Sequence, residues 1–244
     1  LNLKHKDYYS EEYIHYLSKK IGTVIGAFDS ENFCQTLTGN LEDKELFERL
    51  DCIVDALNKT LPRSYTENIK AFFKILGPKL EQSQGMFNIG WWLWPIGRYV
   101  ERYGNEDWML SLAFLKELTK RFTGEYAIRS LLREHPKEVM DELINWTKEE
   151  NVHVRRLASE GVRIRLPWSQ NLFVALDEFE RYYCILTNLK DDPEKFVQKS
   201  VGNNLNDLYK YNPQKADFII NEWIKSGQSK AQNWIIKHGR RNQK

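Results

Sequence analysis

Two stretches of the chain share one pattern, PKEVMDELINW at residues 136–146 and PQKADFIINEW at residues 213–223. Each stretch begins at a proline and ends, ten residues later, at a tryptophan. A basic segment begins eighteen residues after each proline, at Val154 and at Ala231. The repeated order of proline, tryptophan and basic segment indicates that this part of the chain is built from repeated helical units.

The basic segment occurs three times, as VRRLASEGVR from Val154, VQKSVGNNLND from Val197 and AQNWIIKHGRR from Ala231. The offsets between the three copies are 43 and 34 residues, which are typical periods of two-helix solenoid repeats. In such an array, each pair of helices buries its apolar face against the next pair. The repeats therefore predict an all-α solenoid.

The rest of the sequence is also predicted to be helical. The 7 prolines separate segments whose apolar residues recur at helical spacing, and no strict alternation of strand type is present. We expect one domain over residues 1–244, with N-terminal helices in residues 1–90 and the repeats in residues 91–244. No linker rich in glycine or serine divides the 244 residues.

The composition excludes several classes of protein. No run approaches the roughly 18 apolar residues that a membrane span needs, and the first twenty residues lack the apolar core of a signal peptide. The three cysteines, Cys34, Cys52 and Cys184, are too widely spaced for a disulfide framework or a zinc motif. We therefore predict a protein of the reducing cytoplasm, with no membrane partner and no bound metal.

The net charge of +2 conceals an uneven distribution of charge. Residues 1–90 contain 11 basic and 13 acidic side chains, whereas residues 91–244 contain 25 basic and 21 acidic ones. Residues 151–170 alone hold four arginines and one glutamate. A small total charge therefore does not exclude a nucleic-acid partner, because the attraction can be confined to one surface.

Basic and amide side chains recur at one register of the three basic segments. Such side chains, together with helix N-termini, contact the phosphates of DNA. Because stacking places equivalent helices side by side, we expect these groups to line one basic concave surface that binds DNA. A merely solvated face is the alternative. The residues predicted for this surface are Arg155, Arg156, Arg163, Arg165, Lys199, Asn203, Asn204, Lys237, Arg240 and Arg241.

Five motifs resemble those of a known family: WPIGRYVERYG (94–104), RFTGEYAIRSLL (121–132), VRRLASEGVRIRLPW (154–168), VQKSVGNNLND (197–207) and WIIKHGRR (234–241). The chain resembles the bacterial DNA alkylation repair glycosylases, and more narrowly the AlkC-type branch of the AlkC/AlkD superfamily. The resemblance implies a curved solenoid of HEAT-like repeats that excises cationic bases alkylated at N3, chiefly 3-methyladenine and also 3-methylcytosine. It also implies the short form, without the C-terminal immunoglobulin-like domain of many relatives.

The resemblance also implies which residues form the site. The carboxylates that the family uses around the lesion fall on Glu125, Glu160 and Asp207, and the aromatic residue that shapes the lesion site falls on Trp168. The chain departs from the family at Gln198, where an arginine is usual, and this change removes one potential phosphate contact.

Each of these four residues also has a purely structural interpretation that the sequence leaves open. Glu160 can be a salt-bridge partner of the neighbouring arginines, and Asp207 can be a local helix cap. Glu125 can occupy the first turn of a helix, where the helix dipole favours a negative charge. Trp168 can be a buried core residue, since large aromatic side chains are usually mostly buried.

Carboxylates suit the chemistry that the resemblance implies. A base alkylated at N3 is cationic and leaves as a neutral molecule, so the reaction needs little help from a general acid. Carboxylates oppose the positive charge that develops on an oxocarbenium-like sugar, and they accept a proton from the attacking water. Two glutamates and one aspartate meet both needs without a cofactor.

We therefore predict a DNA-3-methyladenine glycosylase-type hydrolase of base excision repair, acting on alkylated double-stranded DNA. We expect a monomer of the bacterial cytoplasm that associates with the nucleoid when it acts, with no cofactor and no obligate protein partner. Two alternatives stay open. One is a non-catalytic helical-repeat protein that binds structured DNA, and the other is a scaffold for protein interactions.

Overall fold

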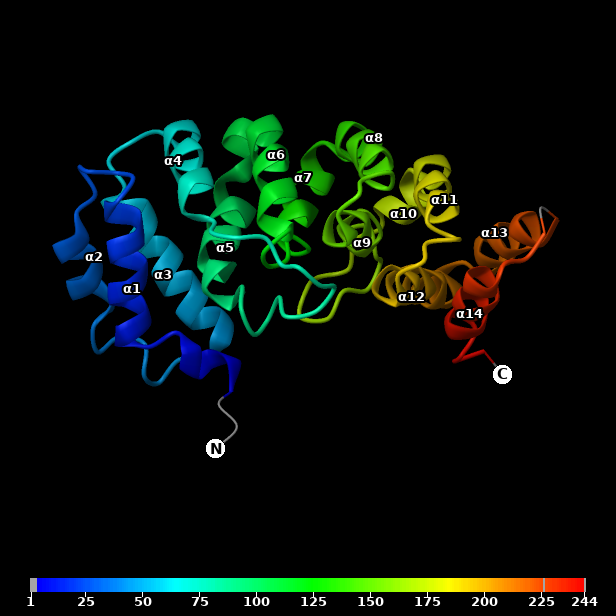
Figure 1. The fold of residues 1–244 in the computed structure, drawn as a ribbon, viewed down its shortest axis with the longest axis horizontal. Coiled ribbons are helices and arrows are strands. Elements are labelled where there is room, and N and C mark those ends of the chain that lie inside the picture. The colour runs from blue at the N-terminus through cyan, green and yellow to red at the C-terminus, as the bar shows by residue number, and fades with distance from the viewer. Residues whose placement is uncertain (1–3, 226, 244) are drawn as a thin grey trace. The chain divides into compact units, whose positions relative to one another are not determined.

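The computed structural model describes residues 4–225 and 227–243, and every regular element in these two ranges is a helix. The prediction of an all-α protein is therefore confirmed (Figure 1). The chain forms two compact units, residues 1–127 and residues 128–244. None of the helices in the described ranges is long and apolar enough to cross a membrane.

The first unit contains α1 (Glu11–Gly22), α2 (Ser30–Leu37), α3 (Leu46–Thr60), α4 (Tyr65–Phe72), α5 (Trp94–Tyr103) and α6 (Trp108–Thr119), with short 3-10 turns η1 (His5–Tyr8), η2 (Phe73–Ile75), η3 (Trp91–Leu93) and η4 (Gly104–Asp107). Helix α3 contacts α2 and α5, and α4 contacts α6. The sequence-based division at residue 90 falls inside this unit, because α5 and α6 pack on helices that precede it.

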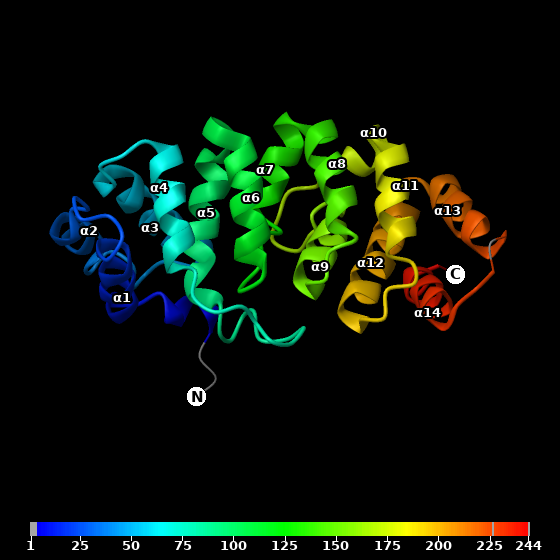
Figure 2. The same ribbon diagram turned by 45° about the horizontal axis from the view of Figure 1, so that its top comes forward.

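The second unit is built from α7 (Ala127–Glu134), α8 (Pro136–Trp146), α9 (Val152–Glu160), α10 (Val174–Asp177), α11 (Phe179–Asn188), α12 (Lys195–Tyr211), α13 (Pro213–Lys225) and α14 (Lys230–Gly239). Helices α8, α11 and α13 form one layer of this unit, and α9, α12 and α14 form the other (Figures 1 and 2). Helix α12 contacts both α9 and α14. The three basic segments therefore lie side by side, as the repeat predicts.

The proline and tryptophan of the repeated pattern have separate structural roles. Pro136 and Pro213 are the first residues of α8 and α13, a position where the missing backbone N–H breaks no helical hydrogen bond. Trp146 and Trp223 are each 1% exposed, and their indole N–H groups donate to polar side chains at 2.7 and 2.9 Å. The pattern thus marks the helix starts and the core of the repeats.

The α12–α14 contact depends on glycines that allow the two helices to approach closely. A Cβ placed on Gly239 would lie 2.7 Å from the Cβ of Leu205, and one on Gly202 would lie 2.8 Å from Cδ2 of His238. Gly239→Ala should therefore lower the free energy of unfolding by about 1–3 kcal/mol, the usual cost of overpacking. Urea denaturation of the purified protein measures this change.

Gly26→Ala is the matched control, because no atom lies within 4 Å of the added Cβ there. We expect the control to change the free energy of unfolding by less than about 1 kcal/mol. Equal losses of stability in the two variants would contradict the close packing of α12 on α14.

Candidate active site

A buried ionic network joins α9 to α12. Arg163 follows the end of α9 and donates from Nη1 to Oε1 of Glu160 at 2.8 Å and from Nε to Oδ2 of Asp207 at 3.0 Å. The three side chains are each 10% exposed or less. Two of the three predicted carboxylates therefore lie at the same guanidinium, although 46 positions separate them in the sequence.

Glu160, the last residue of α9, is fully engaged at both of its carboxylate oxygens. Oε1 also lies 3.3 Å from Nη2 of Arg156, and Oε2 accepts a hydrogen bond of 2.5 Å from the Ser200 hydroxyl. Burial by itself raises the pKa of Glu160, but the charges of Arg156 and Arg163 outweigh burial and leave the pKa below its usual value. Glu160 therefore does form the salt bridges that its sequence context predicts, and it stays ionised.

Asp207 is engaged at only one oxygen. Oδ2 accepts hydrogen bonds from Arg163 and from the backbone N–H of Arg165, the latter at 3.3 Å, whereas no hydrogen bond to Oδ1 occurs within residues 4–225 and 227–243. Burial raises the pKa of Asp207 above its usual value, against the opposing charge of Arg163. Helix α12 continues to Tyr211, so the interpretation of Asp207 as a cap is wrong.

A buried hydroxyl group lies within electrostatic range of Asp207. Tyr182 on α11 is fully buried, and its hydroxyl has no hydrogen-bond partner in the described part of the chain. Burial, and then the charge of Asp207, raise the pKa of Tyr182 well above its usual value. The phenol therefore keeps its proton, and Asp207 is the group of this pair that can accept one.

Glu125 lies in the first compact unit. Glu125 is 5% exposed, and its Oε2 accepts a hydrogen bond of 2.9 Å from Thr123 Oγ1. The backbone N–H of Glu125 donates to the same Thr123 Oγ1 at 3.2 Å. Helix α7 begins only at Ala127, so the interpretation of Glu125 as a first-turn residue is wrong. A part for Glu125 in the same site as Glu160 and Asp207 stays a prediction.

Trp168 lies in the loop between α9 and α10. It is 62% exposed, so its interpretation as a core residue is wrong. Its φ of 63° falls in the left-handed region that residues with large side chains rarely adopt. Backbone strain of this kind persists where the surrounding structure imposes it, and such positions cluster at functional sites.

A buried arginine forms hydrogen bonds to the backbone of the loop that carries Trp168. Arg129 on α7 is fully buried, and its guanidinium donates to the carbonyl oxygens of Arg163 and Gln170, each at 2.6 Å. These carbonyls lie on either side of Trp168 in the sequence, so one side chain fixes both arms of the loop. Sequence reasoning missed this role, although an arginine inside the apolar stretch AIRSLL was the available signal.

The residues predicted to bind DNA fall into two groups, and the first makes its contacts inside the protein: Arg155, Arg156, Arg163 and Asn204. Arg155 pairs with Asp192 at 2.6 Å, and Arg156 lies over the Phe196 ring. Asn204 is fully buried and donates to the carbonyl oxygen of Ser159 at 2.8 Å. These four side chains hold the network and the helices together.

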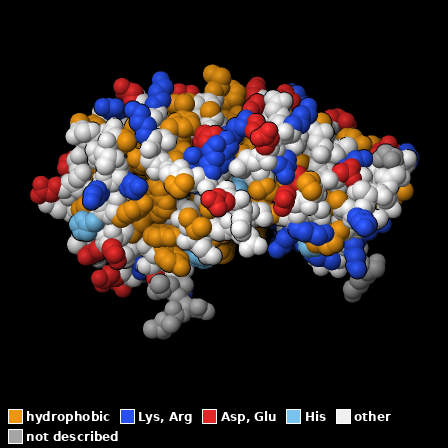
Figure 3. Space-filling model, viewed as in Figure 1, with side chains coloured by type: hydrophobic (Ala, Val, Ile, Leu, Met, Phe, Trp, Pro, Cys, Tyr) orange, Lys and Arg blue, Asp and Glu red, His pale blue; other side chains and the backbone are white. Residues whose placement is uncertain are grey.

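The second group is exposed or half-buried and comprises Arg165, Lys199, Asn203, Lys237, Arg240 and Arg241. Lys and Arg side chains gather over α12 and α14 (Figure 3). Asn203 Oδ1 accepts a hydrogen bond from Arg241 at 3.0 Å. Burial, and then the charges of Arg241 and Lys199, lower the pKa of His238 below its usual value.

Comparison with known proteins agrees with these observations. The sequence model of a family described as DNA alkylation repair enzyme matches residues 122–242. The uncharacterized protein YhaZ of Bacillus subtilis (strain 168) is 34% identical over 239 residues, which cover 97% of this chain and 63% of YhaZ. The structure of Pseudomonas fluorescens alkylpurine DNA glycosylase AlkC, bound to DNA containing an abasic site analog, matches with a TM-score of 0.83 and 28% identity, over 99% of this chain and 65% of AlkC.

The fold defines an all-helical repeat protein, and residues 122–242 match the sequence model of the DNA alkylation repair enzyme family. The helical structure of the chain matches that of AlkC, so the predicted resemblance to the AlkC type is confirmed. The chain spans slightly less than two thirds of the length of YhaZ and of AlkC.

Removal of Arg163 should destabilise the protein, because Glu160 and Asp207 then lose the positive charge that they share. We expect Arg163→Met to lower the free energy of unfolding by about 3–5 kcal/mol at pH 7, the usual cost of removing one partner from a buried ion pair. Without the guanidinium, the pKa of Asp207 in the folded protein should rise further above its unfolded value. The loss should therefore shrink as the pH falls through that raised pKa, because protonation removes the unpaired buried charge.

Chemical denaturation at pH 7 and at pH 5 measures this difference. Arg181→Met is the control, since that arginine pairs with Asp141 and Glu178 at a partly exposed site and should have little effect at either pH. A loss for Arg163→Met that is the same at both pH values would contradict the proposed origin of the effect.

The backbone at Trp168 provides a separate prediction. Trp168→Gly and Trp168→Ala both remove the indole ring, but only glycine adopts a φ of 63° without steric cost. The glycine variant should therefore be more stable than the alanine variant by about 1 kcal/mol. Thermal and urea unfolding compare the two, and an alanine variant as stable as the glycine variant would show that the loop relaxes.

Proposed function

We propose that the protein is a DNA glycosylase of base excision repair that hydrolyses the N-glycosidic bond of cationic, N3-alkylated bases in double-stranded DNA. The observation that carries this proposal is the buried Glu160–Arg163–Asp207 network, in which Oδ1 of Asp207 accepts no hydrogen bond from the described residues. The network lies in the part of the chain that matches the DNA alkylation repair enzyme model. The similarity to AlkC, a structure described as an alkylpurine DNA glycosylase bound to DNA, supports it. We propose 3-methyladenine as the main substrate and 3-methylcytosine as a second one.

Asp207 is assigned the proton transfer. When the bond from C1′ to the base nitrogen breaks, its electron pair neutralises the cationic base, which leaves without a proton donor. A water molecule then forms the new bond to C1′, and its proton passes to the open Oδ1 of Asp207. The raised pKa of this carboxyl group brings it closer to the range in which a general base is effective at neutral pH.

Glu160 supplies a fixed negative charge beside Asp207. Arg156 and Arg163 balance the two carboxylates, so that both can remain ionised in a buried position. Oδ1 of Asp207 is the carboxylate oxygen of the network that accepts no hydrogen bond from the described residues. We assign to this oxygen the stabilisation of the oxocarbenium-like sugar. Glu125 occupies the third carboxylate position of the family's motifs, and we propose that it too takes part in the reaction.

We assign the contacts with DNA to the exposed side chains. Trp168 presents its indole to solvent from a constrained loop, so it can pack on the deoxyribose or beside the damaged base. The phosphates are assigned to the basic surface over α12 and α14, which carries Lys199, Lys237, Arg240 and Arg241, and to Arg165 in the loop. We further propose that the protein acts as a monomer at the nucleoid of a bacterial cytoplasm.

Release of free base under single-turnover conditions tests this function. With duplex DNA that contains 3-methyladenine, the wild-type protein should release the base, and Asp207→Asn should lower the rate about 100-fold or more, as expected for loss of a general base. Glu160→Gln should also lower the rate, because it removes the fixed charge. Asp141→Asn is the control with full activity, since Asp141 pairs with Arg181 outside the network.

The same experiment separates the alternatives when DNA binding is measured alongside base release. Binding without release by the wild-type protein would contradict the proposal and favour a non-catalytic protein that binds structured DNA. Neither binding nor release would favour a scaffold for protein interactions. Full activity of Asp207→Asn would contradict the assignment of Asp207 as the general base.

A further inference from the structure

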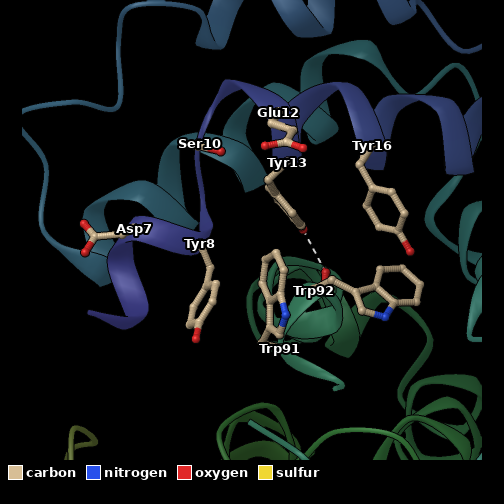
Figure 4. Close-up of a pocket in the computed structure, with 8 residues that line it drawn as sticks. All are labelled: Asp7, Tyr8, Ser10, Glu12, Tyr13, Tyr16, Trp91 and Trp92. Carbon is tan, nitrogen blue, oxygen red and sulfur yellow. Dashed lines mark hydrogen bonds between the residues drawn. The ribbon is translucent and has the colours of Figure 1, made fainter. Parts of the chain in front are cut away.

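A cavity of about 400 Å³ lies in the first compact unit, where η1 and α1 face η3 (Figure 4). Five aromatic side chains line it, together with a serine and two carboxylates: Tyr8, Tyr13, Tyr16, Trp91, Trp92, Ser10, Asp7 and Glu12. None of these residues has a part in the function proposed above. The cavity is large enough for a small organic molecule.

Hydrogen bonds to the backbone hold the two tryptophans in place. The Tyr9 hydroxyl donates to the carbonyl oxygen of Trp91, and the Tyr13 hydroxyl donates to that of Trp92, each at 2.8 Å. The second of these bonds is the dashed line in Figure 4. Because both tyrosines are buried in the core, η3 is fixed against α1, and the walls of the cavity are formed before any ligand binds.

The aromatic rings of the cavity are inclined to one another, so their faces point in different directions. The rings of Tyr16 and Trp92 are nearly perpendicular, at 89°, with 5.6 Å between their centroids. Tyr8 stacks on Trp91 with a centroid distance of 4.9 Å. The electron-rich faces of such rings attract cations.

Charges at the cavity favour a positive ligand. Lys20 of the chain itself places Nζ 5.6 Å from the Tyr16 centroid and 5.7 Å from the Trp92 centroid, within the range of a cation–π interaction. The exposed Glu12 carboxylate makes no ion pair or hydrogen bond with the described residues. Asp7 also lines the cavity, so the lining carries two carboxylates and neither a lysine nor an arginine.

We propose that this cavity binds a small N-methylated organic cation. A methylated cation is weakly hydrated and has few hydrogen-bond donors, so aromatic faces replace its water at low cost, and a nearby carboxylate balances its charge. Two sources share this chemistry, quaternary ammonium compounds and nucleosides that carry a positive charge on an N-methylated base. The proposal stands on the cavity alone and does not depend on the glycosylase activity.

Titration of the full chain, labelled with ¹⁵N at tryptophan, tests the proposal by NMR. The probes are tetramethylammonium, the cationic nucleoside 1-methyladenosine, and adenosine as its neutral counterpart. Both cations should shift the indole signals of Trp91 and Trp92, assigned with Trp91→Phe and Trp92→Phe, and adenosine should bind at least about 10-fold more weakly than 1-methyladenosine. Tighter binding of 1-methyladenosine than of tetramethylammonium identifies a nucleoside ligand, and the reverse order identifies a quaternary ammonium.

Variants separate this cavity from other sites. Glu12→Gln and Tyr16→Leu should each weaken binding of the cations about 3–5-fold, the loss of one cation–π or charge contact, while the exposed control Asp43→Asn should not. Asp207→Asn should leave the shifts unchanged, because that residue does not line the cavity. Absence of shifts with both cations, equal binding of adenosine and 1-methyladenosine, or loss of the shifts in Asp207→Asn would overturn the proposal.

Discussion

The candidate site depends on one buried guanidinium that lies between two buried carboxylates. Ionised carboxylates are costly to bury unless each is paired and hydrogen-bonded. Arg163 meets this need for Glu160 and Asp207 together, and the second arginine at Glu160 compensates the remaining charge. The unequal pairing makes the two carboxyl groups chemically different: Glu160 is held as a permanent anion, whereas Asp207 keeps one open oxygen and a raised pKa.

The helical repeats create this arrangement by packing α9 against α12. The Ser159 hydroxyl donates to the Ser200 hydroxyl at 2.8 Å, and Asn204 donates to the backbone carbonyl of Ser159, so polar contacts fix the register of the two helices. Glu160 and Asp207 then face the same guanidinium from neighbouring repeats. Arg129 fixes the loop that carries Trp168 onto the same unit, and the basic surface lies on the helices of that layer.

The sequence predicted most of the fold, because its signals are local. Pro136 and Trp146 mark the start and the buried end of one helix, and the same spacing recurs in a later repeat. Local signals do not predict which arginine side chains point into the protein and which face solvent. Arg163 lies beyond the end of α9, where helical periodicity no longer says which residues face inward, so the sequence predicts phosphate contacts for it rather than a position between two carboxylates. The exposure of Trp168 likewise follows from a backbone angle and a buried partner that no spacing reveals.

The most direct test of this account is a pH titration of the side-chain carboxyl carbons of Glu160 and Asp207 by ¹³C NMR, with Glu160→Gln and Asp207→Asn used to assign the signals. If Arg163 pairs the two groups unequally, Glu160 should titrate below the ordinary value of about 4.3 and Asp207 above the ordinary value of about 3.9. Ordinary values for both groups, or the opposite order of shifts, would contradict the central role of the network.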